Sequence, residues 1–143
     1  MRFPSPEWAG ALVAALNRQP DLGVALRGLG PDLAAVVEAE PPAIPEDVAV
    51  WGRHAGGRVA EWRLLEDADE ILELEPAYVI RASYRVWKAL LRGEDPLQAA
   101  MSGRVRVQGD LEALVRRARF RYVVDAALSD VPTAFADEVG GPG

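Results

Sequence analysis

Hydrophobic residues recur at helical spacing in the first part of the chain. Trp8, Leu12 and Leu16 stand four residues apart and fall on one face of a helix. A Ser-Pro pair precedes them, and this pair is typical of a helix start because serine caps free amides and proline suits the first turn. The pattern predicts a helix over 5–18 and a short second helix over 21–28.

Three later segments are typical of strands. The run "LAAVVEAEP" is β-branched in its middle and bounded by prolines, which predicts a strand over 33–39. Two further strand-like runs flank Gly56 and Gly57 within "DVAVWGRHAGGRVAEWRLL". Glycines supply the backbone angles of a tight turn, so these two runs predict a hairpin. A further strand is predicted for "AYVIRAS", which ends at Ser83.

The segment "LLRGEDPLQAAMSGRVRVQGD" is interrupted repeatedly by glycine and proline. It follows a helix that Ser83 can cap and that Gly93 ends. The interruptions then predict a short helix from an Asp-Pro start at Asp95 and an alternating strand over 104–107. Asp110 is expected to cap a last long helix.

Composition indicates one packed domain. The chain has 143 residues, of which 50% are hydrophobic, and it contains no cysteine. Disulfides, thiolate catalysis and cysteine zinc sites are therefore excluded. We expect a single domain over 1–143 with its core at about 5–128, and a tail over 129–143 whose end is frayed.

Charge and hydropathy narrow the function classes. The net charge is −6, which argues against a surface that binds nucleic acid. No apolar stretch reaches the roughly 18 residues of a membrane span, so no transmembrane segment is expected. The opening residues also lack the apolar run of a secretory signal. These features predict a cytoplasmic protein.

The sequence offers little material for catalysis. Six carboxylates lie within 66–75, but a calcium loop needs alternating ligands with a central glycine, so this run predicts a solvated connector. The single histidine, His54, is expected to be an exposed bystander beside the hairpin turn. Nucleophile elbows and phosphate loops are absent from the sequence. We therefore expect a protein that is not an enzyme, with no catalytic residue, no metal and no cofactor.

Arginine gathers near the predicted last helix. Six arginines fall within eighteen residues that hold only two acids, Asp110 and Glu112. These arginines are Arg104, Arg106, Arg116, Arg117, Arg119 and Arg121. They fit solvated outer faces of a strand and helix, or a patch for anionic head groups, phosphates or an acidic partner.

The predicted last helix is apolar on two sides. One face holds Leu111, Leu114, Val115, Ala118 and Tyr122, and the roughly opposite face holds Phe120, Val123, Val124 and Ala127. A second apolar face must be buried against more of the chain, a second subunit or a ligand. A homodimer through Phe120, Val123 and Val124 is one of these alternatives.

The stretch "RVWKALLRGEDPLQAAMSGRVRVQGDLEAL" resembles the sterol carrier protein type 2 domain, also called the nonspecific lipid-transfer domain, in a stand-alone prokaryotic form. The resemblance rests on an ordered helix, Asp-Pro turn, glycine-led strand and Gly-Asp helix start. It implies an α+β fold: a five-stranded, antiparallel-rich sheet with helices packed on one face, enclosing an apolar cavity. Such domains bind fatty acids, acyl-coenzyme A, sterols or similar lipids and do not catalyse reactions.

The resemblance also implies where a ligand would lie. The expected cavity residues are Trp87, Leu90, Leu91, Met101, Val105, Val107, Leu111, Leu114, Val115 and Ala118. The expected head-group contacts are Arg104, Arg106, Arg116 and Arg117. The function expected is a lipid carrier. The alternatives are a dimerisation or docking module with a filled cavity, and an accessory subunit of a lipid-metabolising enzyme.

Overall fold

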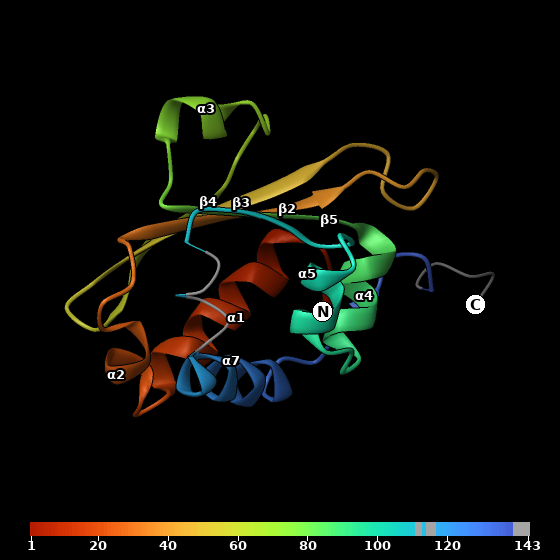
Figure 1. The fold of residues 1–143 in the computed structure, drawn as a ribbon. Coiled ribbons are helices and arrows are strands. Elements are labelled where there is room, and N and C mark those ends of the chain that lie inside the picture. Colours follow the sequence, from red (N-terminus) through yellow and green to blue (C-terminus); the bar gives the residue numbers. More distant parts are fainter. Residues whose placement is uncertain (111–112, 114–116, 139–143) are drawn as a thin grey trace.

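The computed structural model describes residues 1–110, 113 and 117–138 as an α+β fold built on one five-stranded sheet (Figure 1). The strand order is β4-β3-β2-β5-β6. The strands are β2 (Asp32–Glu38), β3 (Val48–Ala55), β4 (Arg58–Leu64), β5 (Tyr78–Ser83) and β6 (Arg106–Gln108). The predicted α+β class and five strands are confirmed.

The sheet is mixed, with one parallel pair. Strand β2 runs parallel to β5, whereas β2–β3, β3–β4 and β5–β6 are antiparallel. The predicted hairpin joins β3 to β4, and Ala55 pairs with Arg58 across a two-residue loop. Both loop residues, Gly56 and Gly57, have positive φ (63° and 78°), which glycine adopts without a steric penalty.

Among the described residues, most helices pack against one face of the sheet, and α3 lies on the other (Figure 1). The helices are α1 (Pro6–Arg18), α2 (Leu22–Leu26), α3 (Glu70–Leu74), α4 (Tyr84–Leu91), α5 (Pro96–Met101) and α7 (Ala118–Ser129). The prediction of helices on one face thus holds for the larger helices. The acidic segment 66–75 is more than the solvated connector expected, because Ile71 is only 4% exposed and packs over β2 and β3.

Three of the predicted helix starts are capped as the sequence indicated. Ser5 accepts a hydrogen bond from the amide of Trp8 (3.1 Å), and Ser83 accepts one from the amide of Val86 (3.4 Å). Asp95 accepts one from the amide of Leu97 (3.0 Å). Each bond satisfies an amide that the first helical turn leaves unpaired, which fixes where α1, α4 and α5 begin.

The two ends of the described chain meet and belong to the core. Strand β1 (Arg2–Phe3) pairs in parallel with β7 (Ala134–Phe135). Phe3 and Phe135 are 4% and 8% exposed, and the ring of Phe3 lies 4.7 Å from that of Trp8. The core therefore extends beyond the range 5–128 expected from sequence, because apolar residues at both ends cover the same side of α1.

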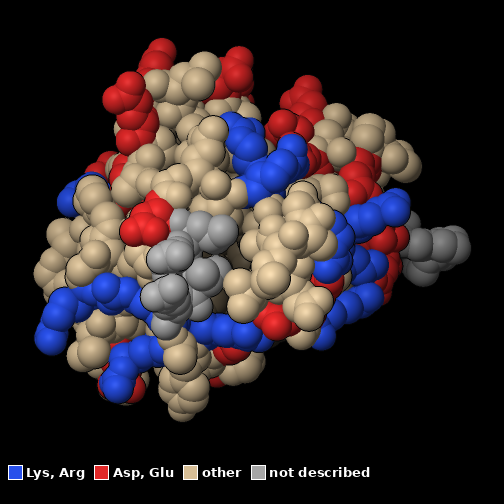
Figure 2. Space-filling view, in the orientation of Figure 1, with Lys and Arg blue, Asp and Glu red and all other residues tan. Residues whose placement is uncertain are grey.

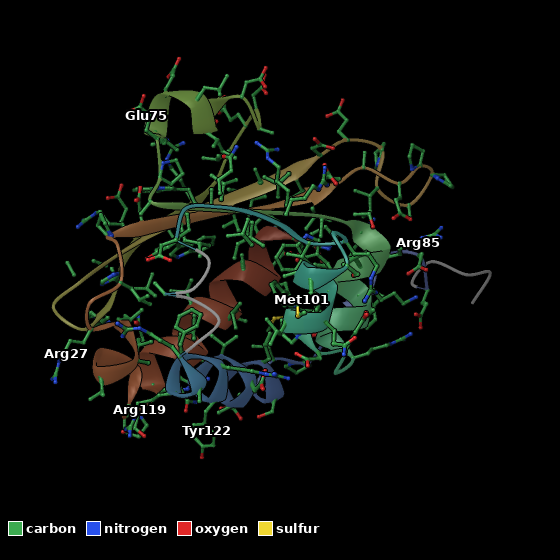
Figure 3. The ribbon with its side chains drawn as sticks, in the orientation of Figure 1. Arg27, Glu75, Arg85, Met101, Arg119 and Tyr122 are labelled. Atoms are coloured by element: carbon green, nitrogen blue, oxygen red, sulfur yellow. The ribbon has the colours of Figure 1, made fainter. Side chains whose placement is uncertain are left out.

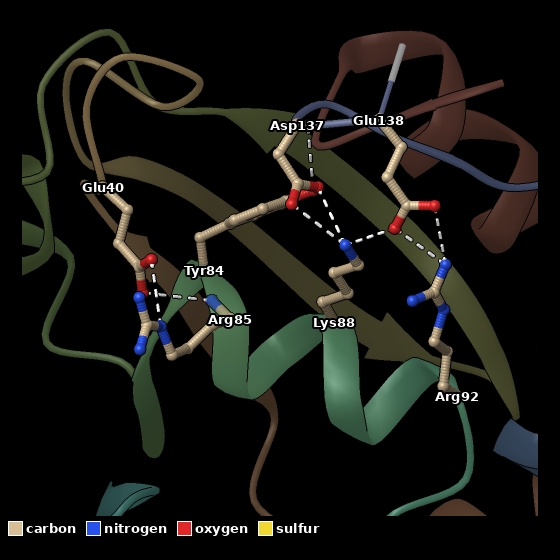
Figure 4. A network of polar contacts seen from close by, with 7 residues as sticks. All are labelled: Glu40, Tyr84, Arg85, Lys88, Arg92, Asp137 and Glu138. Atoms are coloured by element: carbon tan, nitrogen blue, oxygen red, sulfur yellow. Dashed lines mark hydrogen bonds and ion pairs between the residues drawn. The ribbon is translucent and has the colours of Figure 1, made fainter.

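A polar network holds the C-terminal segment on α4 (Figure 4). Lys88 forms ion pairs with Asp137 (3.0 Å) and Glu138, and Arg92 bonds Glu138 (2.8 Å). The hydroxyl of Tyr84 donates a hydrogen bond to Asp137 (2.7 Å). Because Tyr84, Lys88 and Arg92 are spaced by four residues, they share one face of the helix.

This network shifts the pKa values of its members in the directions expected of paired groups. Hydrogen bonds from Tyr84 and Lys88 lower the pKa of Asp137, and those from Lys88 and Arg92 lower the pKa of Glu138. Hydrogen bonds to Glu138 and Asp137 raise the pKa of Lys88. A carboxylate with a lowered pKa stabilises the fold above its unfolded value and loses that contribution as the pH falls.

We predict that Phe135→Ala lowers the free energy of unfolding by about 3–5 kcal/mol, because it leaves a cavity beside Phe3 and Trp8. Urea denaturation followed by tryptophan fluorescence measures this change. The matched control is Tyr122→Ala, whose ring is 68% exposed and whose loss changes stability by no more than about 0.5 kcal/mol. Equal, small effects of both substitutions would show that the chain end does not belong to the core.

We also predict that acid weakens the network on α4. The unfolded pKa values of Asp137 and Glu138 are near 3.8 and 4.5, so their contribution is complete above about pH 5.5 and is lost as the pH falls through the lowered folded values. Urea denaturation between pH 7 and pH 3 should show a smaller acid-induced loss for Asp137→Asn/Glu138→Gln than for the wild type. The exposed Glu46→Gln is the control, and parallel curves for all three proteins would contradict the prediction.

Candidate functional site

Two pockets lie between the sheet and the helices on its larger covered side. The first, which we call the hairpin pocket, has a volume of about 250 Å³ and is lined by the hairpin β3–β4, β2, α1 and α2. Its walls are almost wholly apolar. They include Leu12, Leu16, Leu26, Leu33, Val50 and Trp62.

The second, which we call the α4–α5 pocket, has a volume of about 270 Å³ and lies between α4, α5, α7 and the strands β5 and β6. Its walls are also largely apolar. They include Ile80, Trp87, Leu90, Leu97, Val107 and Leu128. Two charged residues of this wall, Arg121 and Asp125, belong to α7.

Strand alternation explains why the pocket floors are apolar. Successive side chains of a strand point to opposite faces, so Leu33 and Ala35 lie on the side of the pockets. Ala34 and Val36, both fully buried, instead belong to the core cluster beneath α3. β2 is therefore apolar on both faces, and the face with Leu33 and Ala35 borders the hairpin pocket.

One helix, α7, borders both pockets. Phe120 and Val124 line the hairpin pocket and also the α4–α5 pocket. Between them in sequence, Val123 is 1% exposed and packs against Leu22 and Leu26 of α2. The contact of Val123 with α2 fixes the position of α7. It thereby places Phe120 and Val124 where the two pockets adjoin.

Polar groups close one end of the hairpin pocket. The Nε2–H of His54 donates a hydrogen bond to the carbonyl of Gly30 (2.8 Å), and the amide of Gly30 donates one to the hydroxyl of Tyr78 (3.1 Å). His54 is half-buried and lines the pocket, so the expectation of an exposed bystander was wrong. The register of the β3–β4 pair shifts between Arg53 and His54, and such a β-bulge changes the direction in which the side chains that follow it point.

A second polar contact joins α1 to the edge strand β4. The side-chain amide of Asn17 donates to the carbonyl of Val59 (3.2 Å) and accepts from the amide of Val59 (2.9 Å). Asn17 thus pairs with backbone groups that an edge strand leaves without a neighbouring strand. Sequence reasoning placed Asn17 at a helix end and missed this contact, because no local pattern identifies the strand it pairs with.

The structure brings together half of the cavity residues expected from sequence. Trp87, Leu90, Leu91, Val105 and Val107 all line the α4–α5 pocket. Their common position follows from the predicted helix face and from the alternation of residues 105–107. Leu111, Leu114 and Val115 lie outside the described residues.

Met101 and Ala118 are placed away from the pockets. Met101 is 80% exposed, because the short α5 turns Ala99 into the core and Leu97 and Ala100 toward the pocket, leaving its last residue in solvent. Ala118 is also exposed, at the first turn of α7. Neither contributes to the wall of either pocket.

The expected head-group arginines are engaged elsewhere. Arg104 pairs with Glu94 and Arg106 pairs with Glu38, while a guanidinium nitrogen of Arg117 donates to the carbonyl of Arg27. Arg116 lies outside the described residues.

Two other arginines border the pockets. Arg121 lines the α4–α5 pocket and contacts Asp95 (3.3 Å) and Asp125 (3.7 Å). Arg53 borders the hairpin pocket, but its guanidinium pairs with Glu61 of the same hairpin (3.4 Å) and the wall there stays almost wholly apolar. Arg121 is therefore the better placed of the two to meet a charged group inside a pocket.

Charged side chains are unevenly distributed over the face drawn in Figure 2. In Figure 2, acidic side chains gather over α3, whereas arginine forms a band over α2 and α7. Figure 3 shows Arg27 and Arg119 in that band, directed outward from the body of the fold.

The apolar residues named as one alternative for a homodimer surface are partly buried within the chain itself. Val123 is buried against α2, and Phe120 and Val124 face the pockets. Tyr122, expected on the buried face, is 68% exposed and points outward (Figure 3). The burial expected for the face of Ala118 and Tyr122 was wrong: α7 begins at Ala118, after the non-helical Arg117, so these two residues do not continue the apolar face of a helix that starts at Asp110.

Within the part of the chain that the structure describes, no cluster of three or more histidine, aspartate or glutamate side chains is arranged to hold a metal ion. Over the same residues, no helix combines the length and apolar character that crossing a membrane requires. The candidate site therefore consists of the two apolar pockets and the few polar groups at their edges.

We predict that Asn17→Ala lowers the free energy of unfolding by about 1–3 kcal/mol, because two part-buried backbone groups of Val59 lose their partners. Urea denaturation measures the change. Gln98→Ala on the exposed side of α5 is the matched control and should have no measurable effect. A neutral Asn17→Ala would mean that solvent replaces both bonds.

Two solved structures share the fold of this chain at lower sequence identity. The solution structure of a conserved protein from Thermus thermophilus has a TM-score of 0.66 and 24% identity, covering 97% of this chain and 91% of that one. The UbiJ-SCP2 ubiquinone synthesis protein has a TM-score of 0.54 and 24% identity, with 89% and 95% covered. No curated protein matches the chain in a sequence search.

A family profile and a further solved structure also match the chain. A crystal structure of sterol carrier protein 2 superposes with a TM-score of 0.70 and 27% identity, covering 87% of this chain and 95% of that one. The profile of the SCP-2 sterol transfer family matches residues 56–119. The resemblance found in residues 85–114 is confirmed: the chain matches the SCP-2 sterol transfer family in sequence and in fold.

Proposed function

We propose that this protein binds and carries an apolar, lipid-like molecule in the pockets between its sheet and helices. The observation that carries the proposal is the pair of pockets, whose walls are almost wholly apolar and are built from helices and strands along most of the described chain. Unfilled apolar space lowers the stability of a small domain. We therefore infer that the pockets have a function, namely to bind a ligand. The match to a sterol transfer family and to a sterol carrier protein supports the same use.

A simple free-energy estimate indicates which ligands such walls can hold. Each buried methylene contributes about 0.8 kcal/mol, and association costs about 4 kcal/mol or more. A chain of ten methylenes therefore binds weakly, with a Kd of about 1 mM, and a chain of about fifteen reaches the micromolar range. We infer that selectivity rests on chain length and shape more than on specific polar contacts.

The polar end of the ligand has a candidate partner in Arg121. This residue lines the α4–α5 pocket, and its two carboxylate contacts, at 3.3 and 3.7 Å, are on exposed side chains. Exposed ion pairs are weak, so a ligand carboxylate or phosphate can compete for the guanidinium. This favours a fatty acid or acyl-coenzyme A over an uncharged sterol as the ligand. It gives Arg121 the role that sequence reasoning gave to Arg104, Arg106, Arg116 and Arg117.

The alternative of a docking module with a filled cavity is less well supported. It requires a free apolar face on α7, but Val123 is buried within the chain. It also requires side chains to fill the space beneath the helices, and two pockets remain there. We therefore propose a carrier that presents its ligand without transforming it.

The test is uptake of hexadecanoate by delipidated protein, measured by isothermal titration calorimetry. Ala35 lies on the floor of the hairpin pocket in the central strand β2, where a tryptophan side chain would occupy the empty volume. We predict that Ala35→Trp weakens binding at least tenfold. Leu72→Trp is the matched control, because Leu72 is 75% exposed on α3, across the sheet from the pockets, and its substitution should leave Kd unchanged.

Two outcomes would reject the carrier proposal. One is wild-type protein that takes up neither hexadecanoate nor its coenzyme A ester. The other is a Kd that Ala35→Trp and Leu72→Trp change equally, since ligand would then bind outside the pockets.

A further inference from the structure

The floors of the two pockets adjoin on the sheet. Ala35 of β2 belongs to the hairpin pocket, and Ile80 of β5 belongs to the α4–α5 pocket. These two residues are direct partners in the parallel β2–β5 ladder. Neighbouring strands lie about 5 Å apart, which is less than the width of one side chain, so the pockets adjoin along this ladder.

The separation between the pockets comes from α7. Phe120 and Val124 are the residues common to both sets of walls within the described part of the chain. They are one turn apart on the helix and face the sheet at the point where the floors adjoin. Phe120 is only partly buried and packs at the edge of the cluster formed by Leu22, Leu26 and Val123. Its ring is thus held on one side only.

The two compartments differ in chemistry. The α4–α5 pocket carries Arg121 and Asp125, whereas the exposed wall of the hairpin pocket is almost entirely apolar. A ligand with one charged end is therefore oriented: its head lies beside Arg121, and its tail points along the floor toward Ile80 and Ala35. The ring of Phe120 stands in the path of that tail.

Volume indicates what this partition does. Each pocket alone is smaller than the roughly 300–1,000 Å³ of sites that enclose drug-sized ligands, and the two together fall within that range. A short acyl chain fits the α4–α5 pocket alone. A long chain has to enter both pockets, which requires the ring of Phe120 to move.

We propose that Phe120 is the residue that determines which ligand chain lengths this protein accepts, as a movable partition between the two pockets. The inference rests on the proposed carrier function and adds to it a ligand orientation and a length limit. Val124, a smaller residue one turn further along, completes the partition. The side-chain rotation of Phe120 joins the pockets into one elongated site.

The experiment measures how affinity depends on chain length. Octanoate, dodecanoate and hexadecanoate are titrated calorimetrically, below their micelle concentrations, into wild type, Phe120→Ala and Phe120→Trp. Each methylene that enters a preformed apolar site strengthens binding by about fourfold. In the wild type we expect a smaller gain between octanoate and hexadecanoate, because the longer chain must displace the ring.

The variants should change this dependence in opposite directions. Phe120→Ala should raise the hexadecanoate-to-octanoate affinity ratio at least tenfold, and Phe120→Trp should lower it. Leu128→Ala is the matched control, because Leu128 lines only the α4–α5 pocket and should weaken all three ligands by a similar factor. Circular dichroism confirms folding, and Phe120→Leu replaces the alanine variant should that variant fail to fold.

The outcomes separate this inference from the proposed function. An opposite shift of the affinity ratio in Phe120→Ala and Phe120→Trp supports the partition. Binding of all three acids with the same length dependence in wild type and every variant overturns the partition and leaves the carrier function standing. Absence of binding for every chain length in every protein overturns both.

Discussion

The central constraint on this fold is that strand β2 is apolar on both faces and must be covered on both. Its alternating residues divide into Ala34 and Val36 on one side and Leu33 and Ala35 on the other. A single short helix, α3, suffices to cover the first side, which is closely packed. The second side is spanned by α1, α4 and α7, and these helices bridge above a floor that contains small residues such as Ala35. Small side chains on the strand leave volume unfilled beneath the helices, and this volume forms the pockets.

Local signals in the sequence were reliable because they rest on backbone chemistry. Ser83 and Asp95 cap helices wherever the fold places them, and Gly56 and Gly57 permit the hairpin turn in any tertiary context. The helix face that contains Trp87 and Leu90 was found for the same reason, since spacing alone determines it. These features, together with the family resemblance, predicted the α+β fold and part of the α4–α5 pocket.

Tertiary partners could not be read from the sequence in the same way. Ile71 lies within the acidic segment 66–75, and its sequence neighbours do not indicate that it is buried. Its burial becomes visible only once the position of the sheet is known. The face of Ala118 and Tyr122 was expected to be buried because it was taken as part of one long helix from Asp110, whereas α7 begins at Ala118. Met101 was misplaced because it is the last residue of a helix too short to show a clear apolar face. Arginines looked free in the sequence because their carboxylate partners come from distant segments, as Glu38 does for Arg106.

The pairing of β1 with β7 has a consequence for how the chain folds. Arg2 and Ala134 are partners across nearly the whole length of the protein, and closing so long a loop is entropically unfavourable until the intervening elements have assembled. The local hairpin β3–β4 can form early, because its strands are adjacent in sequence. The two-stranded sheet of β1 and β7 is therefore expected to form late in folding. The ion pairs of Lys88 with the segment that follows β7 form at the same stage. A protein caught before that stage would already have its sheet, while Trp8 of α1 would still lack the cover that Phe3 and the β7 segment give it in the folded core.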